Sequence, residues 1–242
     1  MKTLVVPDIH EQVEKLEKLS NFFEKWDTVV FLGDWFDTYG PRKHTSTARF
    51  LKERLDDKRY VFLLGNHDGH YAFQHAGFLC SGFQWQTKED LRTILGPEDW
   101  KRFRLFYQAG PFLLSHAGLR PETKHFIDEE MEALEMAASG KFHRAFAAGW
   151  SRGGYEEFGG PTWLDWEKEF MPLVKRPQIV GHSQMNRVRT RMNTNAEGFS
   201  SYCIDDALKS LVVVHSSGVL DWYKVANIIG DEIDKPLTGS VV

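Results

Sequence analysis

Aspartate, asparagine and histidine residues recur directly after apolar segments along this 242-residue chain. The stretch FLLGNHDGHY, residues 62–71, joins such a segment to Asn66, His67, Asp68 and His70. These polar types are common in turns, where Asn and Asp side chains bond to their own backbone. They also suit an active site, because open α/β sheets place their chemistry beyond the carboxyl ends of their strands. Recurrence of the pattern along the chain separates the two interpretations.

The same kind of ending occurs at four further places. The residues concerned are Asp8 and His10 in PDIH, Asp34 and Asp37 in GDWFD, His116 in SHAG, and His182 in GHS. A turn requires no histidine, yet four of the ten histidines of the chain occur in these endings. The recurrence therefore favours a shared site over unrelated turns.

The residue types of these endings indicate metal binding. Carboxylates, an amide oxygen and neutral imidazoles suit divalent metals such as Mn, Fe, Zn, Co and Ni. No ending contains a cysteine, which argues against a structural zinc site. The pattern therefore predicts two metal ions at the carboxyl edge of a sheet, about 3.5–4 Å apart as in a typical two-metal site.

Alternating strand-like and helix-like segments are expected to position these residues. Short apolar, β-branched runs predict strands at 3–8, 28–34 and 60–66, and helical spacing predicts helices at 11–26 and 44–55. This order favours parallel strands joined by right-handed crossovers. Further strands are expected at 111–118, 178–183 and 201–206, with a hairpin at 211–225, and further helices at 87–95, 98–106, 121–138 and 141–148.

Composition limits the function classes. A length of 242 residues suits a single domain, with a loosely ordered tail from about residue 231. The net charge is −4 and no long basic run occurs, so charge gives no support to a nucleic-acid partner. Cys80 and Cys203 do not form a disulfide framework. Without a signal peptide or a long apolar run, we expect a cytoplasmic protein with no membrane partner; the oligomeric state is not indicated.

The ordered motifs DIH, GDWFD, GNHD, SHAGLRP and GHS, from Asp8 to His182, resemble those of the calcineurin-like metallophosphoesterase superfamily. The SHAGLRP segment is most similar to the serine/threonine phosphoprotein phosphatases and the related diadenosine tetraphosphate hydrolases. The resemblance implies an α/β fold, namely a four-layer α/β/β/α sandwich with mixed sheets. It also implies two divalent metal ions between the sheets, with Mn expected first and Fe, Zn, Ni or Co as alternatives.

The resemblance also assigns roles by motif position. Asp8 and His10 would hold the first metal, and Asp34 would bridge both metals. The residues that would hold the second metal are Asn66, His116 and His182.

A hydroxide that bridges the two metals would attack phosphorus, as is usual in this family. His67 would stand beside the metals and protonate the leaving oxygen, and Asp37 would orient its ring. These two residues are therefore the predicted catalytic pair, distinct from the metal ligands.

The chain departs from the phosphoprotein phosphatases where an arginine normally grips phosphate. In those enzymes the second motif continues as Asp-Arg-Gly, whereas Thr38 and Tyr39 follow Asp37 here. The candidate replacements are Arg42, Arg120 and Arg152. A solvated surface charge is the alternative role for each of them. Trp163 and Trp166 similarly offer either base stacking or core packing.

Three functions are compatible with these features. The main hypothesis is a metal-dependent phosphatase acting on phosphomonoesters of small molecules, nucleotides or phosphoproteins. The alternative is a phosphodiesterase or nuclease, because GDWFDTYGP resembles the second motif of DNA-repair nucleases of the same superfamily. Those nucleases end in GHxH, however, and Gln184 stands at the second histidine position here, which leaves the first metal with fewer protein ligands. A non-catalytic scaffold is expected to lose ligands, and all six proposed positions are kept.

Overall fold

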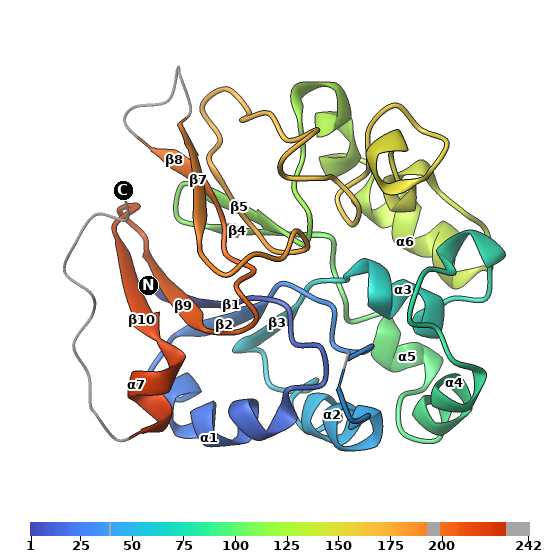
Figure 1. Cartoon of the computed structure of the whole chain (residues 1–242), viewed down its shortest axis with the longest axis horizontal. Helices are drawn as coiled ribbons and strands as arrows, with labels where there is room; N and C mark the ends of the chain where they lie inside the picture. The colour runs from blue at the N-terminus through green and yellow to red at the C-terminus, as the bar shows by residue number, and fades with distance from the viewer. Residues whose placement is uncertain (39, 193–198, 231–242) are drawn as a thin grey trace.

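Two stacked five-stranded β-sheets form the centre of the protein, as shown by a computed structural model (Figure 1). The structure describes residues 1–38, 40–192 and 199–230, so the tail predicted from residue 231 lies outside it. The first sheet has the order β10-β9-β1-β2-β3 and the second has the order β4-β5-β6-β8-β7. The strands are β1 (Lys2–Val6), β2 (Thr28–Phe31), β3 (Tyr60–Phe62), β4 (Phe106–Ala109), β5 (Phe112–Ser115), β6 (Gln178–Val180), β7 (Arg189–Met192), β8 (Ser200–Cys203), β9 (Ser210–His215) and β10 (Leu220–Lys224).

Each sheet combines three adjacent parallel strands with antiparallel pairings. In the first sheet β1, β2 and β3 are parallel, β9 is antiparallel to β1, and β10 is antiparallel to β9. In the second sheet β5, β6 and β8 are parallel, while β4 and β7 are antiparallel. Both sheets are therefore mixed, and each brings the carboxyl ends of three parallel strands to one edge.

The inner faces of the two sheets share one apolar core. It combines Val5, Val30 and Val212 of the first sheet with Leu114 and Ile179 of the second, all of them buried. Burying an aliphatic side chain of this size contributes roughly 1.5–3 kcal/mol. The shared core holds the sheets face to face.

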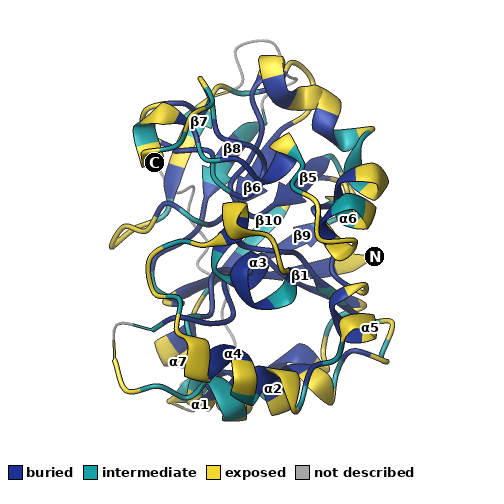
Figure 2. Ribbon diagram, turned by 90° about the vertical axis from the view of Figure 1, so that its right-hand side faces the viewer, coloured by how far each residue is buried: buried dark blue, intermediate teal, exposed yellow. Residues whose placement is uncertain are grey.

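Helices cover the outer face of the first sheet (Figures 1 and 2). The α-helices are α1 (Val13–Phe23), α2 (His44–Lys52), α3 (Asn66–Ala72), α4 (Trp85–Arg92), α5 (Pro97–Trp100), α6 (Glu130–Ala138) and α7 (Val225–Ile229), and 3₁₀ turns span Ala76–Phe78, Pro121–Ile127, Arg144–Phe146 and Trp150–Arg152. In α1 the buried positions Leu16, Leu19 and Phe23 recur at helical spacing and face the sheet. On the second sheet, Trp166 and Phe170 pack against Val180 and Cys203. The predicted four-layer α/β/β/α fold with mixed sheets is confirmed.

Several predicted boundaries were wrong. The helix expected at 98–106 is α5 followed by strand β4, and the helix expected at 141–148 is only the turn Arg144–Phe146. The helix expected at 121–138 divides into a 3₁₀ segment and α6. Strand β7 and helices α3 and α7 were not predicted.

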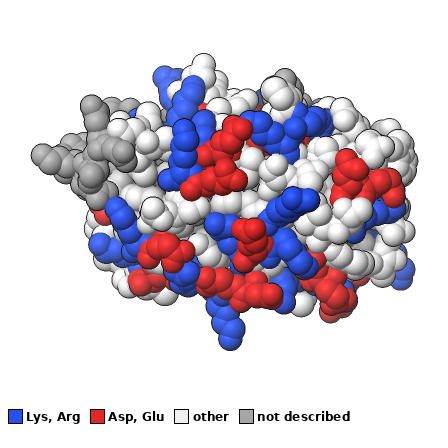
Figure 3. All heavy atoms as spheres, turned by 90° about the horizontal axis from the view of Figure 1, so that it is seen from below, with Lys and Arg blue, Asp and Glu red and all other residues white. Residues whose placement is uncertain are grey.

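Two surface properties bear on partners. Among the described residues, none of the helices is both long and apolar enough to span a bilayer. On the face seen from below in Figure 1, the side where α1, α2 and α4 lie, basic and acidic side chains are interspersed (Figure 3). This face does not offer the broad basic surface that binding to a nucleic-acid backbone requires.

Candidate metal centre

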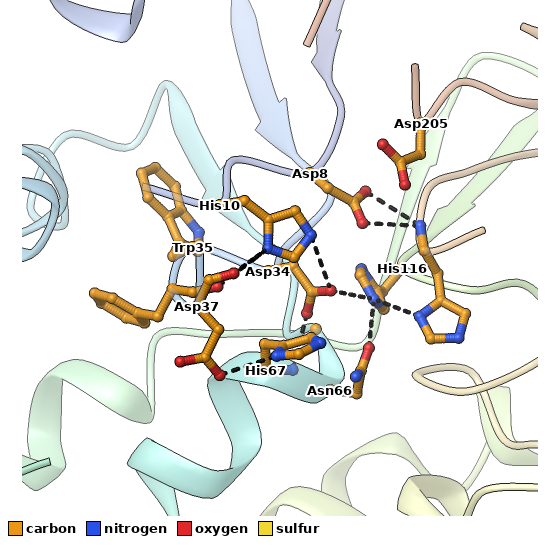
Figure 4. Close-up of polar contacts among 12 residues, drawn as sticks. Asp8, His10, Asp34, Trp35, Asp37, Asn66, His67, His116 and Asp205 are labelled. Atoms are coloured by element: carbon orange, nitrogen blue, oxygen red, sulfur yellow. Dashed lines mark hydrogen bonds and ion pairs between the residues drawn. The ribbon is translucent and has the colours of Figure 1, made fainter. Parts of the chain in front are cut away.

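The eight predicted metal-binding and catalytic residues lie together at the edge where the parallel strands of both sheets end. The first sheet contributes the turns after β1, β2 and β3, and the second contributes the turns after β5 and β6. Figure 4 shows Asp8, Asp34, Asn66 and His116 converging from these separate turns. A cavity of about 430 Å³ opens above them.

Unusual backbone conformations mark this edge. His10, Asp34, Asp37 and His182 have φ angles of 44°, 49°, 66° and 64°, in the left-handed region. Such residues cost roughly 1–3 kcal/mol each and persist where the surrounding structure enforces them. Four of the eight predicted residues share this property, which is typical of functional sites.

Asp68 helps to hold the backbone of these turns in place. Its buried carboxylate accepts hydrogen bonds from the backbone N–H groups of Asp34 at 2.9 Å, Trp35 at 2.8 Å and Gly65 at 2.9 Å. Burial and the Asp34 carboxylate raise the pKa of Asp68 to about 7. Asp68 therefore ties the turn after β2 to the turn after β3.

Two glycines allow these turns to approach each other. Gly33 has φ of 110°, and a Cβ there would lie 2.5 Å from the backbone nitrogen of Gly65. A Cβ on Gly65 would lie 2.1 Å from Asp34 Oδ1. Any larger residue would push the Asp34 carboxylate out of place.

One oxygen of Asp34 lies between two imidazoles from different sheets. Asp34 Oδ2 is 3.8 Å from Nε2 of His10 and 3.4 Å from Nε2 of His116. Its other oxygen, Oδ1, accepts a hydrogen bond from the backbone N–H of His67 at 2.9 Å. This placement matches the bridging role predicted for Asp34.

His116 Nε2 faces two acceptor oxygens and a second imidazole. His116 Nδ1 donates to the carbonyl oxygen of Leu32 at 2.9 Å, so a neutral ring presents a lone pair at Nε2. That nitrogen lies 3.1 Å from Asn66 Oδ1 and 3.2 Å from His182 Nδ1, besides Asp34 Oδ2. Converging lone pairs of this kind need a cation or an added proton between them.

Charge effects in the absence of metal support the same conclusion. Burial lowers the pKa of His116, but the Asp34 and Asp8 carboxylates outweigh it and raise that pKa to about 10. Burial and the nearby Asp205 carboxylate hold the pKa of Asp8 well above its usual range. A proton on His116 thus compensates the carboxylates where a metal ion would otherwise do so.

The remaining predicted ligands also have free coordinating atoms. His10 Nδ1 donates to the carbonyl oxygen of Asp37 at 2.9 Å, which leaves His10 Nε2 facing Asp34. His182 is half-buried, and its Nε2 has no hydrogen-bond partner among the described residues. Asp8 accepts the backbone N–H of His182 at 2.9 Å. The donor set and its unpaired atoms fit divalent metal ions at two adjoining clusters, Asp8–His10–Asp34 and Asp34–His116–His182.

The predicted catalytic pair is also in contact. His67 Nδ1 is 2.9 Å from Asp37 Oδ2, and His70 Nε2 lies 2.7 Å from the same oxygen. Asp37 Oδ1 accepts from the Tyr71 hydroxyl at 2.5 Å and from Arg42 Nη1 at 2.8 Å. Although burial raises the pKa of Asp37, the two imidazoles and the hydroxyl outweigh it and keep that pKa below its usual range.

The three candidate arginines occupy different environments. Arg42 pairs with Asp37, and Arg120 pairs with Glu122 at 2.6 Å while its guanidinium covers the ring of Phe158. Within the described part of the chain, Arg152 lines the cavity and the other two do not. Arg152 Nε lies 2.8 Å from Asp165 Oδ2, and its Nη2 donates to the Ser183 hydroxyl at 2.9 Å.

The two tryptophans also differ. Trp163 lines the cavity, and its ring lies edge-on to His182 with 5.7 Å between the ring centroids. Trp166 is only 2% exposed and stacks on Phe170 at 4.1 Å. Trp163 can therefore contact a bound molecule, whereas Trp166 belongs to the core.

Sequence reasoning missed three site residues. Asp68 and His70 have no predicted role beyond the stretch FLLGNHDGHY, yet both are fully buried beside the site. Asp205 follows strand β8, lines the cavity and was not singled out. It lies two residues beyond β8, whose sequence SSYC alternates half-buried and buried positions, so the signal is weaker than at the continuous apolar strands.

The sequence of residues 1–185 matches the family model described as calcineurin-like phosphoesterase. No curated protein sequence matches this chain. The family match covers the segments that carry all eight predicted metal-binding and catalytic residues.

Solved structures share the fold at low identity. The cold-active protein-tyrosine phosphatase of the psychrophile Shewanella sp. matches with a TM-score of 0.62 and 15% identity, over 98% of this chain and 80% of that one. A structure of cold-active protein tyrosine phosphatase at 1.1 Å matches with a TM-score of 0.57 and 17% identity, over 91% and 78%. A protein serine/threonine phosphatase from Saccharomyces cerevisiae matches with a TM-score of 0.50 and 12% identity, over 93% and 80%. At these identities the matches show the fold alone.

Proposed function

The chain belongs to the calcineurin-like phosphoesterase family, and we propose that it hydrolyses phosphomonoesters with two divalent cations held at one site. The observation that carries this proposal is the position of Asp34 Oδ2, 3.8 Å from His10 Nε2 and 3.4 Å from His116 Nε2. One carboxylate oxygen between two imidazoles can serve both cations.

The proposed ligands divide into two sets that share Asp34. Asp8 and His10 complete the first set. The second set consists of Asn66, His116 and His182 beside Asp34. Their oxygen and nitrogen atoms suit Mn first, with Fe, Zn, Ni or Co as alternatives. When bound, the cations would neutralise phosphate charge and acidify the water that they contact.

His67 is the proposed proton donor. Its Nδ1 contacts Asp37 Oδ2 at 2.9 Å, so its Nε2 is the nitrogen left to face a leaving group. Burial lowers the pKa of His67, but the carboxylates of Asp34 and Asp37 outweigh it and raise that pKa above its usual value. A raised pKa favours the protonated ring, which is the form that a leaving alkoxide requires.

Arg152 is the proposed replacement for the missing phosphate-gripping arginine. It lines the cavity together with His67 and His182, and its side chain is 31% exposed. Arg42 instead donates two hydrogen bonds of 2.8 Å, one from Nη1 to Asp37 Oδ1 and one from Nη2 to the carbonyl oxygen of Gly82. We therefore assign Arg42 to positioning the His67–Asp37 pair rather than to binding substrate.

A metal-by-substrate matrix tests the proposed function. Metal-free protein would be assayed with Mn, Ni, Co, Zn and Mg against a nitrophenyl phosphate monoester, the matching diester, a dinucleoside polyphosphate and a phosphopeptide. We expect metal-dependent turnover with the monoester favoured over the diester. Faster turnover of the diester would instead support the phosphodiesterase alternative, and no turnover with any metal would contradict both.

A further inference from the structure

Asp205 is a buried carboxylate that has no assigned role at the metal centre. It follows strand β8, is 1% exposed and lines the same cavity as His10 and Asp34. Figure 4 shows its carboxyl group pointing toward the carboxyl group of Asp8.

The strand register explains why Asp205 reaches this place. Strands β6 and β8 are parallel neighbours, and Val180 of β6 pairs with Cys203 of β8. His182 and Asp205 each come two residues after this pair, so the same edge of the sheet presents both. The Asp205 carbonyl accepts a hydrogen bond from Met185 N at 3.0 Å, which joins it to the loop that carries His182.

The hydrogen bonding of Asp205 is incomplete. Its Oδ1 receives only a long contact of 3.3 Å from the Ala207 N–H, and its Oδ2 has no partner among the described residues. The neighbouring Asp206 is equally buried, yet its Oδ1 accepts from Lys209 N at 2.9 Å and from Ser210 N at 3.0 Å. Buried carboxylate oxygens are normally paired or bound to metal, so the free oxygen of Asp205 is available to a cation in the cavity.

The first metal set is also the one that is short of protein ligands. Gln184 stands where the second histidine of a GHxH motif would be, so β6 supplies no further imidazole to this set. Asp8, whose carboxyl group faces Asp205, belongs to the same set. Two buried carboxylates that face each other repel unless a cation lies near both.

We propose that Asp205 is a further ligand of the cation held by Asp8, His10 and Asp34. This inference rests on the proposed function, since it concerns one of the two proposed metal positions. A carboxylate at this position favours a hard cation such as Mn²⁺ over softer ions.

Metal titration of Asp205→Asn tests the inference, with Asp206→Asn as the matched control. Mn²⁺ binding to metal-free wild-type and variant proteins would be measured by isothermal titration calorimetry, and retained metal by elemental analysis after desalting. We expect Asp205→Asn to weaken one of two sites by about 10- to 100-fold or more, the range seen when supporting groups of metal sites are lost. Asp206→Asn should keep both Mn²⁺ affinities, since its carboxylate binds only backbone groups of the next turn.

Thermal unfolding of the metal-free proteins separates a ligand from a structural residue. Asp205→Asn removes one of two facing carboxylates, so its melting temperature should equal or exceed that of the wild type, whereas Asp206→Asn should be less stable. If Asp205→Asn fails to fold, Asp205→Ser provides the same titration. Unchanged Mn²⁺ affinity at both sites in a folded Asp205 variant would overturn the inference and leave the proposed function intact. A wild-type protein that binds no divalent cation would overturn both.

Discussion

Two polar clusters lie side by side at the strand ends, and they differ in whether their polar atoms are paired. The first, the Asp34 cluster, consists of Asp8, His10, Asp34, Asn66, His116 and His182. The second, the Asp37 cluster, consists of Asp37, Arg42, His67, His70 and Tyr71. In the Asp34 cluster, His116 Nε2 lies 3.1 Å from Asn66 Oδ1 and 3.4 Å from Asp34 Oδ2, and no cationic side chain pairs with these oxygens among the contacts described above. In the Asp37 cluster, a carboxylate is surrounded by a guanidinium, a hydroxyl and two imidazoles.

The difference suggests that the Asp34 cluster binds cations and that the Asp37 cluster orients His67. The Asp34 cluster is electrostatically incomplete without cations, since its carboxylates are compensated by a proton on His116, whose pKa is raised to about 10 after burial is outweighed by Asp34 and Asp8. In the Asp37 cluster the carboxylate already has charged and hydrogen-bonding partners, so it can hold His67 in one orientation before substrate arrives. We therefore expect substitutions in the first cluster to change metal content and substitutions in the second to change only the chemistry.

Asp34→Asn should have the largest effect of the four substitutions. A small effect would contradict the proposed difference between the Asp34 and Asp37 clusters. The amide keeps the shape but removes the charge that both cations would share, so metal content should fall and turnover should drop by more than about 10³-fold, exceeding the loss of a single electrostatic group. Elemental analysis and monoester hydrolysis measure the two effects. Asp90→Asn, a surface aspartate that pairs with His44 at 2.9 Å, is the control. Full turnover with unchanged metal stoichiometry would remove the bridging role.

His67→Ala should leave metal content unchanged and slow hydrolysis by about 10²–10⁴-fold for an alkyl monoester, the usual contribution of a general acid. The loss should shrink markedly for a nitrophenyl ester, because that leaving group needs little protonation. His44→Ala is the matched control, since His44 Nε2 lies 2.9 Å from Asp90 Oδ2 in an imidazole–carboxylate pair that is not part of the cavity lining.

Two results would contradict the role of His67. Equal losses for good and poor leaving groups would exclude proton donation. Loss of bound metal would make His67 a ligand and would place it in the Asp34 cluster instead.

Asp37→Asn should reproduce the His67 pattern in milder form. Asp37 acts through the ring of His67, and replacing a charged hydrogen-bond partner costs about 1.5–3 kcal/mol, or roughly 10- to 150-fold in rate. The leaving-group dependence of kcat, measured over a series of monoesters, distinguishes this positioning role from general destabilisation. A uniform loss for all leaving groups, with metal content intact, would show that Asp37 supports the fold rather than the proton transfer.

The strands and the main site residues were predictable because one physical rule links them. A parallel strand that is buried on both faces is a continuous apolar run, and the residue after it lies at the edge of the sheet. Asp8, Asp34 and His182 all follow such runs. Asp205 is harder to predict because strand β8, SSYC, is not a continuous apolar run and is buried on alternate positions only.

Other elements gave no sequence signal. Strand β7 reads RTRM and has no apolar alternation, because it lies at the edge of the second sheet and its Arg189 pairs with Glu167 at 2.8 Å. Helix α3 reads NHDGHYA, a turn-like composition that becomes helical because Asp68 and His70 are buried in polar contacts. The helix expected at 141–148 did not form; Phe146 packs against Phe73 and Phe78 from a single 3₁₀ turn. In each case tertiary contacts overrode local preference.

Arg152→Ala should have the smallest effect of the four substitutions. It tests whether a residue of the solvent-exposed cavity beside the Asp34 cluster contributes to phosphate binding. Arg152 is partly exposed and already paired with Asp165, so its contact with phosphate is screened, and we expect the low end of a charge-assisted bond, about 1.5 kcal/mol or roughly tenfold. The loss should appear mainly as a higher KM for monoesters and be smaller for diesters, which carry less charge.

Arg144→Ala is the control, because Arg144 also pairs with an acidic residue, Glu156, at 3.1 Å, and it does not line the cavity. Metal content should stay at the wild-type value in both variants. An Arg152 variant with unchanged KM for monoesters and diesters alike would show that the phosphate is held by the Asp34 cluster and its cations alone.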